Sequence, residues 1–151
     1  MKRIVIAVAA AAAVVLTALL GSAGAQSGAP TGTLELVQLE RENSSAFVDN
    51  PPRRRESPGD VFTVSGPVRD AQGRRIGKAN GAFTQTGRNA AHGAATFMLA
   101  EGRIVVVGAL AGAGANALAI AGGSGAYEGA SGTATVTTRR NRTEFVLRFG
   151  G

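Results

Sequence analysis

The sequence predicts an all-β protein, either a sandwich or an up-and-down barrel, and three observations support this fold class. Eight short segments with strand-like apolar patterns follow one another after residue 32, and most are separated by short turns. No segment beyond the N-terminal region has the 3.6-residue periodicity of a helix. Glycine accounts for 22 of 151 residues, about double the usual frequency of about 7%, and each glycine destabilises a helix interior by about 1 kcal/mol.

The N-terminal region has the three-part layout of a secretory signal peptide. A basic start, Met1–Arg3, precedes 17 uncharged residues that end at Leu20, and the small residues Ala23-Gly24-Ala25 follow. We expect cleavage after Ala25, a flexible leader over residues 26–32, one domain over residues 33–151, and a secreted protein with no stable membrane anchor. The alternative is an uncleaved N-terminal anchor, because 17 residues is the lower limit for spanning a bilayer.

The mature chain begins with a clear strand pattern and a long polar stretch. Thr33–Arg41 alternates, so that Leu34 and Leu36 share one face. Glu42–Gly59 is polar, with three prolines and the run Arg53–Arg55. It is expected to be a long exposed loop. The arginine run suggests a solvated loop or, less simply, a site for an anion.

The rest of the chain alternates between strand patterns and turn signals. The further strands are expected at Asp60–Val68, Arg75–Thr86, Ala94–Leu99, Arg103–Leu110, Ala117–Ala121, Thr133–Thr138 and Thr143–Phe149. Turns are expected at Asp70–Gly73, Arg88–Gly93, Glu101–Gly102 and Gly112–Asn116, with a glycine-rich segment at Gly122–Gly132. Disorder of Ala109–Ala126 is an alternative, but it would leave the apolar side chains of Leu118 and Ile120 without packing partners. Closing eight antiparallel strands removes exposed edges and leaves room for one small ligand.

Composition excludes several classes of function. The absence of cysteine excludes disulfides, a thiol nucleophile and cysteine-based metal sites. His92 is expected in a surface turn without further ligands nearby, so we predict no metal and no cofactor. Loss of Lys2 and Arg3 reduces the net charge from +6 to +4. No basic patch is interleaved with aromatic residues, so nucleic acid is not an expected partner.

The motif Gly122–Gly129 is the most distinctive in the chain. It lacks the G-x-G-x-x-G spacing and the following helix of a dinucleotide loop. It also lacks the last glycine of a nucleophile elbow, because Ala126 stands there. We therefore expect a structural bend in which Gly122, Gly123, Gly125 and Gly129 make the turn, some of them at positive φ, with Tyr127 packed beneath.

Here the sequence resembles the allene oxide cyclase and dirigent-like barrels. Leu118–Ala121 running into Gly122–Gly132 matches their strand, Gly-Gly-Ser-Gly turn, aromatic residue and small-x-Gly step. Ordered supporting matches lie at Gly59-Asp60 with Phe62, Arg75–Gly81, Ala95–Phe97 through Gly102, Val107-Gly108 and Glu144–Leu147. The resemblance spans about Thr33 to Phe149. It implies an eight-stranded antiparallel β-barrel of calycin-like shape, an apolar pocket, and a homodimer or homotrimer.

The resemblance transfers the plant enzymes' polar residues only in part. Glu40 matches the glutamate of the first cyclase strand, and it is the candidate catalytic residue. The cyclase asparagine, cysteine and tyrosine fall near Gly66, Phe83 and Leu110. The dirigent aspartate and arginine fall at Ser65 or Gly66 and at Glu128. Related bacterial polyketide cyclases need few fixed polar groups but are usually intracellular. Predicted ligand-binding residues are Phe62, Phe83, Phe97 and Tyr127.

Glu40 and Glu42 form a second candidate feature. In an extended strand they would share a face with Cβ atoms about 6.5 Å apart, either as an acid–base pair or pointing into solvent.

The sequence leaves three possible functions for the protein. The first is a secreted barrel that binds an apolar small molecule without assignable catalysis. The second is a shape-directed cyclase or isomerase that holds its substrate in a near-attack conformation. The third is an interaction module of the cell envelope.

Overall fold

The protein is described from a computed structural model that covers residues 28–50, 57–112 and 114–150. The predicted signal peptide, the first two residues of the leader and the run Arg53–Arg55 lie outside the described residues. Within the described ranges, no helix is long and apolar enough to cross a membrane.

The described residues form nine strands and one short 3-10 helix, η1 (Glu40–Glu42). The strands are β1 (Gly32–Leu39), β2 (Ser44–Val48), β3 (Val61–Arg69), β4 (Arg75–Gly87), β5 (Ala90–Leu99), β6 (Gly102–Ala111), β7 (Ala115–Gly125), β8 (Gly132–Arg139) and β9 (Arg142–Phe149). All pairings are antiparallel, in the order β1-β9-β8-β7-β6-β5-β4-β3-β2. The all-β prediction is therefore confirmed.

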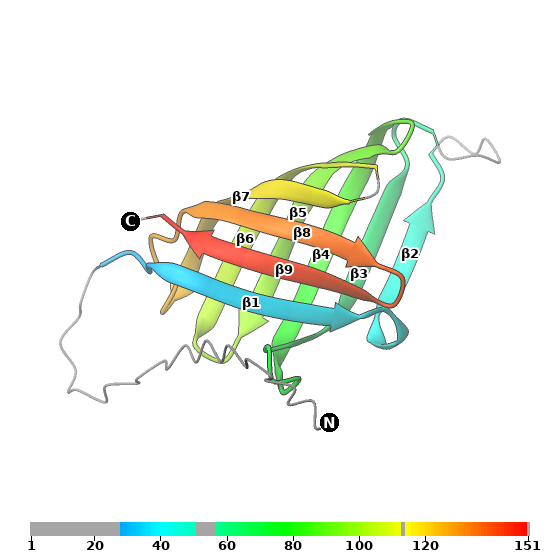
Figure 1. Cartoon of the computed structure of the whole chain (residues 1–151). Coiled ribbons are helices and arrows are strands. Elements are labelled where there is room, and N and C mark those ends of the chain that lie inside the picture. Colours follow the sequence, from blue (N-terminus) through cyan, green and yellow to red (C-terminus); the bar gives the residue numbers. More distant parts are fainter. Residues whose placement is uncertain (1–27, 51–56, 113, 151) are drawn as a thin grey trace, which may run out of the picture.

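A contact between β1 and β3 closes the sheet into a barrel of eight strands (Figure 1). β1 pairs with β9 from Gly32 to Leu39 and meets β3 at Val37, opposite Arg69. The chain then turns through η1, and β2 pairs with the other half of β3, from Val61 to Ser65. β2 is thus a ninth strand outside the closed ring. The predicted eight-stranded antiparallel barrel is confirmed.

Alternation places one face of each strand inside the barrel. The innermost side chains are at most 2% exposed and come from strands throughout the chain: Leu36, Val68, Phe97, Ile104, Val106, Leu118, Ala134 and Leu147. Phe97 packs edge-on against Phe145 with ring centroids 5.0 Å apart. Burial of these side chains is the main source of stability that the fold offers.

Two predicted loop assignments are wrong, and in each case strand pairing outweighed the local sequence. The expected loop Glu42–Gly59 contains β2, whose residues are all exposed but gain backbone partners on β3. The expected turn Arg88–Gly93 is mostly strand, and only the two residues before Ala90 turn, with Asn89 at φ 57°. His92 is therefore an exposed strand residue opposite Thr84.

The glycine-rich segment also extends a strand before it bends. β7 continues to Gly125, so the parts of Ala109–Ala126 that lie in β6 and β7 belong to paired strands and are not disordered. Gly122, Gly125 and Gly129 have φ of 147°, 66° and 72°. Gly123 has no positive φ. Glycine is needed at this position because there is no room for a side chain: a Cβ there would overlap the carbonyl oxygens of Tyr127 and Arg103.

Candidate functional site

The barrel encloses a cavity of about 200 Å³ that reaches the end formed by η1 and the hairpin between β8 and β9. Most of its lining is apolar or aromatic. The lining residues are Gln38, Glu40, Asn43, Phe62, Val64, Ala79, Asn80, Gly81, Phe83, Ala95, Leu110, Leu118, Val136, Thr138, Thr143 and Phe145. Its volume is below the range of about 300–1,000 Å³ typical of drug-sized ligands, so a compact guest fits best.

Small residues at inward positions create this cavity. Gly81 of β4 lies opposite Ala95 of β5, and both face the interior. A Cβ added at Gly81 would meet the side chains of Phe83, Ala95 and Val64 at 3.0–3.4 Å. Larger side chains at this pair would therefore occupy the space that the cavity now offers.

An aromatic wall forms one side of the cavity. Phe62 of β3 and Phe83 of β4 are register partners, and their rings stack with centroids 5.3 Å apart and an interplanar angle of 15°. Phe145 contributes a third ring to the lining. Such a wall suits a flat apolar ring system, because offset stacking adds to the burial of apolar area.

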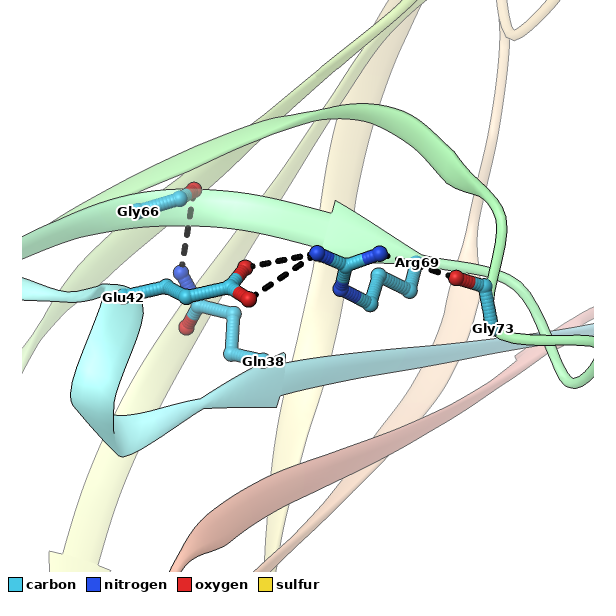
Figure 2. A network of polar contacts seen from close by, with 5 residues as sticks. All are labelled: Gln38, Glu42, Gly66, Arg69 and Gly73. Carbon is cyan, nitrogen blue, oxygen red and sulfur yellow. Dashed lines mark hydrogen bonds and ion pairs between the residues drawn. The ribbon is translucent and has the colours of Figure 1, made fainter.

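Gln38 is the buried polar side chain of the cavity, and it is only 3% exposed. Its Nε2 donates to the backbone carbonyl of Gly66 over 3.2 Å, as Figure 2 shows. Asn43 packs against the same glycine, and its Oδ1 lies where a Cβ of residue 66 would be. Gly66 is thus required by close approach, since any side chain there would displace Asn43.

A charged network fixes η1 to the barrel beside Gln38 (Figure 2). Arg69 Nη2 donates to both carboxylate oxygens of Glu42 at 2.9 Å, and Nη1 donates to the carbonyl of Gly73 at 2.9 Å. The backbone N–H of Glu40 donates to the carbonyl of Asn141 over 3.1 Å. These contacts hold the turn between β1 and β2 at the mouth of the cavity.

Glu40 and Glu42 do not share the face that an extended strand would give them, because both lie in η1. The expected placement of both carboxylates on one face of an extended strand is therefore wrong, and the acid–base pair that depended on it is not formed. Glu40 lines the cavity, and its Oε1 accepts a hydrogen bond from Thr143 Oγ1 over 3.3 Å. Glu42 faces Arg69 instead. A single carboxylate, Glu40, is left to act at the mouth.

The four aromatic residues predicted to bind ligand are placed differently. Phe62 and Phe83 line the cavity. Phe97 is fully buried behind it, against Phe145. Tyr127 lies in the turn after β7 and stacks on Phe149 at the other end of β9, with centroids 6.0 Å apart. Partial burial and, secondarily, the nearby Glu101 raise the pKa of its hydroxyl.

Sequence reasoning missed Gln38, Asn43, Thr138 and Thr143. For Gln38 a signal existed, because period-two alternation places it on the face of Leu34 and Leu36, where a polar residue is unusual. For the others no local signal existed, since they meet only through pairing of distant strands. The residues that the structure describes contain no group of three or more histidine, cysteine, aspartate or glutamate side chains suited to a metal ion.

Comparison with known families identifies the fold group. The family model described as the allene oxide cyclase barrel-like domain matches residues 35–148. The chain belongs to this family. No curated protein sequence matches the chain at a significant level.

Solved structures agree with this membership and include several catalysts. A pyocyanin demethylase superposes with a TM-score of 0.69 at 21% identity, covering 79% of this chain and 100% of its own. The pterocarpan synthase dirigent protein PsPTS1 gives 0.60 at 18% identity, covering 79% and 94%. The Diels-Alderase AbmU from Streptomyces koyangensis gives 0.59 at 20% identity, covering 79% and 64%. At these identities the likeness establishes the shared fold.

Proposed function

We propose that this family member converts an apolar small molecule inside its barrel, as a shape-directed cyclase or isomerase. The observation that carries the proposal is the largely apolar cavity inside the barrel with one carboxylate, Glu40, at its mouth. The structural neighbours named as a demethylase, a pterocarpan synthase and a Diels-Alderase support small-molecule chemistry in this barrel type.

In this mechanism the walls supply most of the catalysis. A cavity that accepts one folded conformation of a flexible substrate removes the entropy cost of bringing its reacting atoms together. Glu40 would accept a proton or stabilise developing positive charge where the substrate reaches the mouth. Ring closure or isomerisation rearranges bonds within one molecule, so no oxidant or reductant is consumed.

The proposal is tested with two neighbouring alanines of β5. Ala95 faces the cavity, whereas Ala94 belongs to the outward-facing set and pairs with Ala82 and Val107. The wild type and the variants Ala95→Phe and Ala94→Phe are incubated with a small-molecule extract of the source organism. Chromatography with mass spectrometry should show a product of unchanged mass with wild type and Ala94→Phe, and none with Ala95→Phe. An unchanged extract, or equal conversion by Ala95→Phe, would contradict the proposal.

Binding without turnover is the second candidate. It is supported by the mismatch at the positions of the plant cyclases, where Gly66, Phe83 and Leu110 stand in place of polar residues. In the same experiment, pure binding predicts that wild type retains a compound that Ala95→Phe does not, with no new product. Glu40→Gln separates the two further, because it should lower turnover and leave retention of an apolar compound nearly unchanged.

We also propose that the protein is exported and loses residues 1–25. The basic start, the apolar run and the small residues before Gln26 support this proposal. N-terminal sequencing of protein from the culture medium should begin at or close to Gln26. Intact protein in the membrane fraction, still carrying Lys2 and Arg3, would contradict it.

A further inference from the structure

The orientation of the Gln38 side chain is determined by its partner. The Gly66 carbonyl can only accept a hydrogen bond, so the nitrogen of the Gln38 amide must face it and the oxygen must face away. Figure 2 shows Nε2 directed at Gly66 and Oε1 on the opposite side of the amide. The hydrogen bond therefore fixes the orientation of the amide.

Gln38 Oε1 has no hydrogen-bond donor among the residues that the structure describes. The residue as a whole is 97% buried and lines the cavity. Its Oε1 is not among the fully buried unpartnered atoms of the described residues, which are Asn43 Oδ1 and Arg69 Nε, so this oxygen stays accessible from the cavity. An acceptor that is accessible from a mostly apolar cavity can take a hydrogen bond from a water or from a guest in that cavity. Native proteins rarely leave such a group unpaired unless a water or ligand completes it.

Several other polar groups at this end also present acceptor oxygens. Glu40 is the charged member of the lining. The Thr143 hydroxyl already donates to Glu40, and it also lies 3.5 Å from Thr138 Oγ1. Asn43 Oδ1 is buried without a partner among the described residues. A guest with a hydrogen-bond donor therefore fits this end, whereas an anion would meet a carboxylate and amide oxygens.

We propose that Gln38 Oε1 accepts a hydrogen bond from the ligand, and that the ligand is a compact, uncharged ring compound with a hydroxyl or N–H group at one end. The aromatic wall of Phe62 and Phe83 would hold the ring system. This inference rests on the proposed function in that it places the small molecule in the same cavity. It adds the class of ligand and a positioning residue that the sequence comparison did not supply.

The test uses three matched probes that share one bicyclic ring. 2-Naphthol can donate a hydrogen bond, 2-methoxynaphthalene cannot, and 2-naphthoate is an anion. Binding of each to the wild-type protein is measured by titration calorimetry. A net hydrogen bond of about 0.5–1.5 kcal/mol corresponds to an affinity about 2–10-fold higher for 2-naphthol than for 2-methoxynaphthalene. The naphthoate should bind at least tenfold more weakly than 2-naphthol.

Variants then assign the preference to Gln38. Gln38→Leu should bind 2-naphthol and 2-methoxynaphthalene equally, while Glu35→Leu, on the exposed face of the same strand, should keep the wild-type preference. Ala95→Phe should abolish binding of every probe. Persistence of the preference in a folded Gln38→Leu, or in Ala95→Phe, would overturn the inference.

The wild-type comparison keeps the inference testable if Gln38→Leu does not fold. Equal affinities of wild type for 2-naphthol and 2-methoxynaphthalene would overturn the role of Gln38 and leave the proposed function standing. Failure of all three probes to bind would instead count against the cavity as a ligand site, and both proposals would fall together.

Discussion

The two ends of the barrel are built from the same alternating strands but differ in what fills them. At the end where β8 begins, inward positions carry Ile104, Ile120 and Leu147, which are at most 5% exposed. At the end of η1, the inward positions on β4 and β5 carry Ala79, Gly81 and Ala95, and a cavity remains. Close packing and an internal cavity therefore lie at different ends of the barrel, and side-chain volume at inward positions makes the difference.

The largest expected effect is the loss of a side chain from the packed end. Leu147 is fully buried, so Leu147→Ala should lower the free energy of unfolding by about 2–5 kcal/mol, because the surrounding strands cannot collapse onto the space. Leu110 already borders the cavity and is only partly buried. Leu110→Ala should cost about 1 kcal/mol. Urea denaturation of both variants measures the difference. Equal losses of unfolding free energy would show that the two ends of the barrel are packed equally well.

Two glycines provide the next largest effect, Gly123 inside β7 and Gly114 directly before it. A side chain at Gly123 would overlap backbone oxygens, including Arg103 O at 2.6 Å. Gly123→Val should therefore destabilise the fold by about 2–3 kcal/mol. Gly114 has open space around it but a φ of 120°, so Gly114→Val should cost only about 1 kcal/mol, from backbone strain. Thermal melts compare them, and a larger loss at Gly114 would show that strain outweighs crowding here.

Asp60 should give a smaller effect that depends on pH. Its carboxylate is buried and accepts hydrogen bonds from the backbone N–H groups of Asn50 and Ser57 and from the Ser57 hydroxyl. These bonds, the one from Asn50 first, hold the pKa of Asp60 below its ordinary value of 3.8. A lowered folded pKa means that the stabilisation is present above about pH 4 and is lost as the pH falls through the folded value.

The measurement is the melting temperature of wild type and Asp60→Asn at pH 7 and at decreasing pH. Wild type should be the more stable at pH 7, and the gap should close below about pH 4. Glu35→Gln, on the exposed face of β1, serves as the control and should follow wild type. A gap that stays constant down to pH 2 would show that the carboxylate charge at residue 60 is not the cause.

The smallest effect concerns the network that holds η1 over the cavity. Arg69→Lys keeps the charge opposite Glu42 but cannot also reach the Gly73 carbonyl with a second planar donor. Because both charged side chains are about a quarter exposed, solvent screening limits the loss of unfolding free energy to about 1 kcal/mol. Urea denaturation checks this value. A loss as large as that of Leu147→Ala would mean that η1 stabilises the whole barrel.

Local alternation predicted most of the fold because each barrel strand exposes one face. The strand from Thr143 to Phe149 is typical, since Phe145, Leu147 and Phe149 recur with period two, whereas Arg103–Leu110 is a short apolar run bounded by turn residues. β2 could not be predicted in this way. Its five residues, SSAFV, are all exposed and gain their structure from β3, fifteen or so residues further along.

Of the candidate site, the sequence predicted Glu40, Phe62 and Phe83, which the structure brings to one cavity. Their roles in binding and catalysis stay predictions. It did not indicate the Gly66 contact, because close approach of Asn43 to a glycine depends on η1 folding back over β3. Nor did it separate Glu40 from Glu42, since only the tight turn of η1 sends one to the cavity and the other to Arg69.

By itself, the sequence determined the class of fold, the inward face of most strands and the need for glycine near β7, because these follow from period-two alternation and from backbone sterics within a few residues. Only the tertiary structure decided where the barrel closes, which inward positions meet, and that small residues at Gly81 and Ala95 coincide to leave a cavity beside Gln38. The physical reason is that the volume of a cavity depends on the sizes of all the inward side chains around it. Those side chains come from strands far apart in the sequence, so no single segment can reveal the cavity.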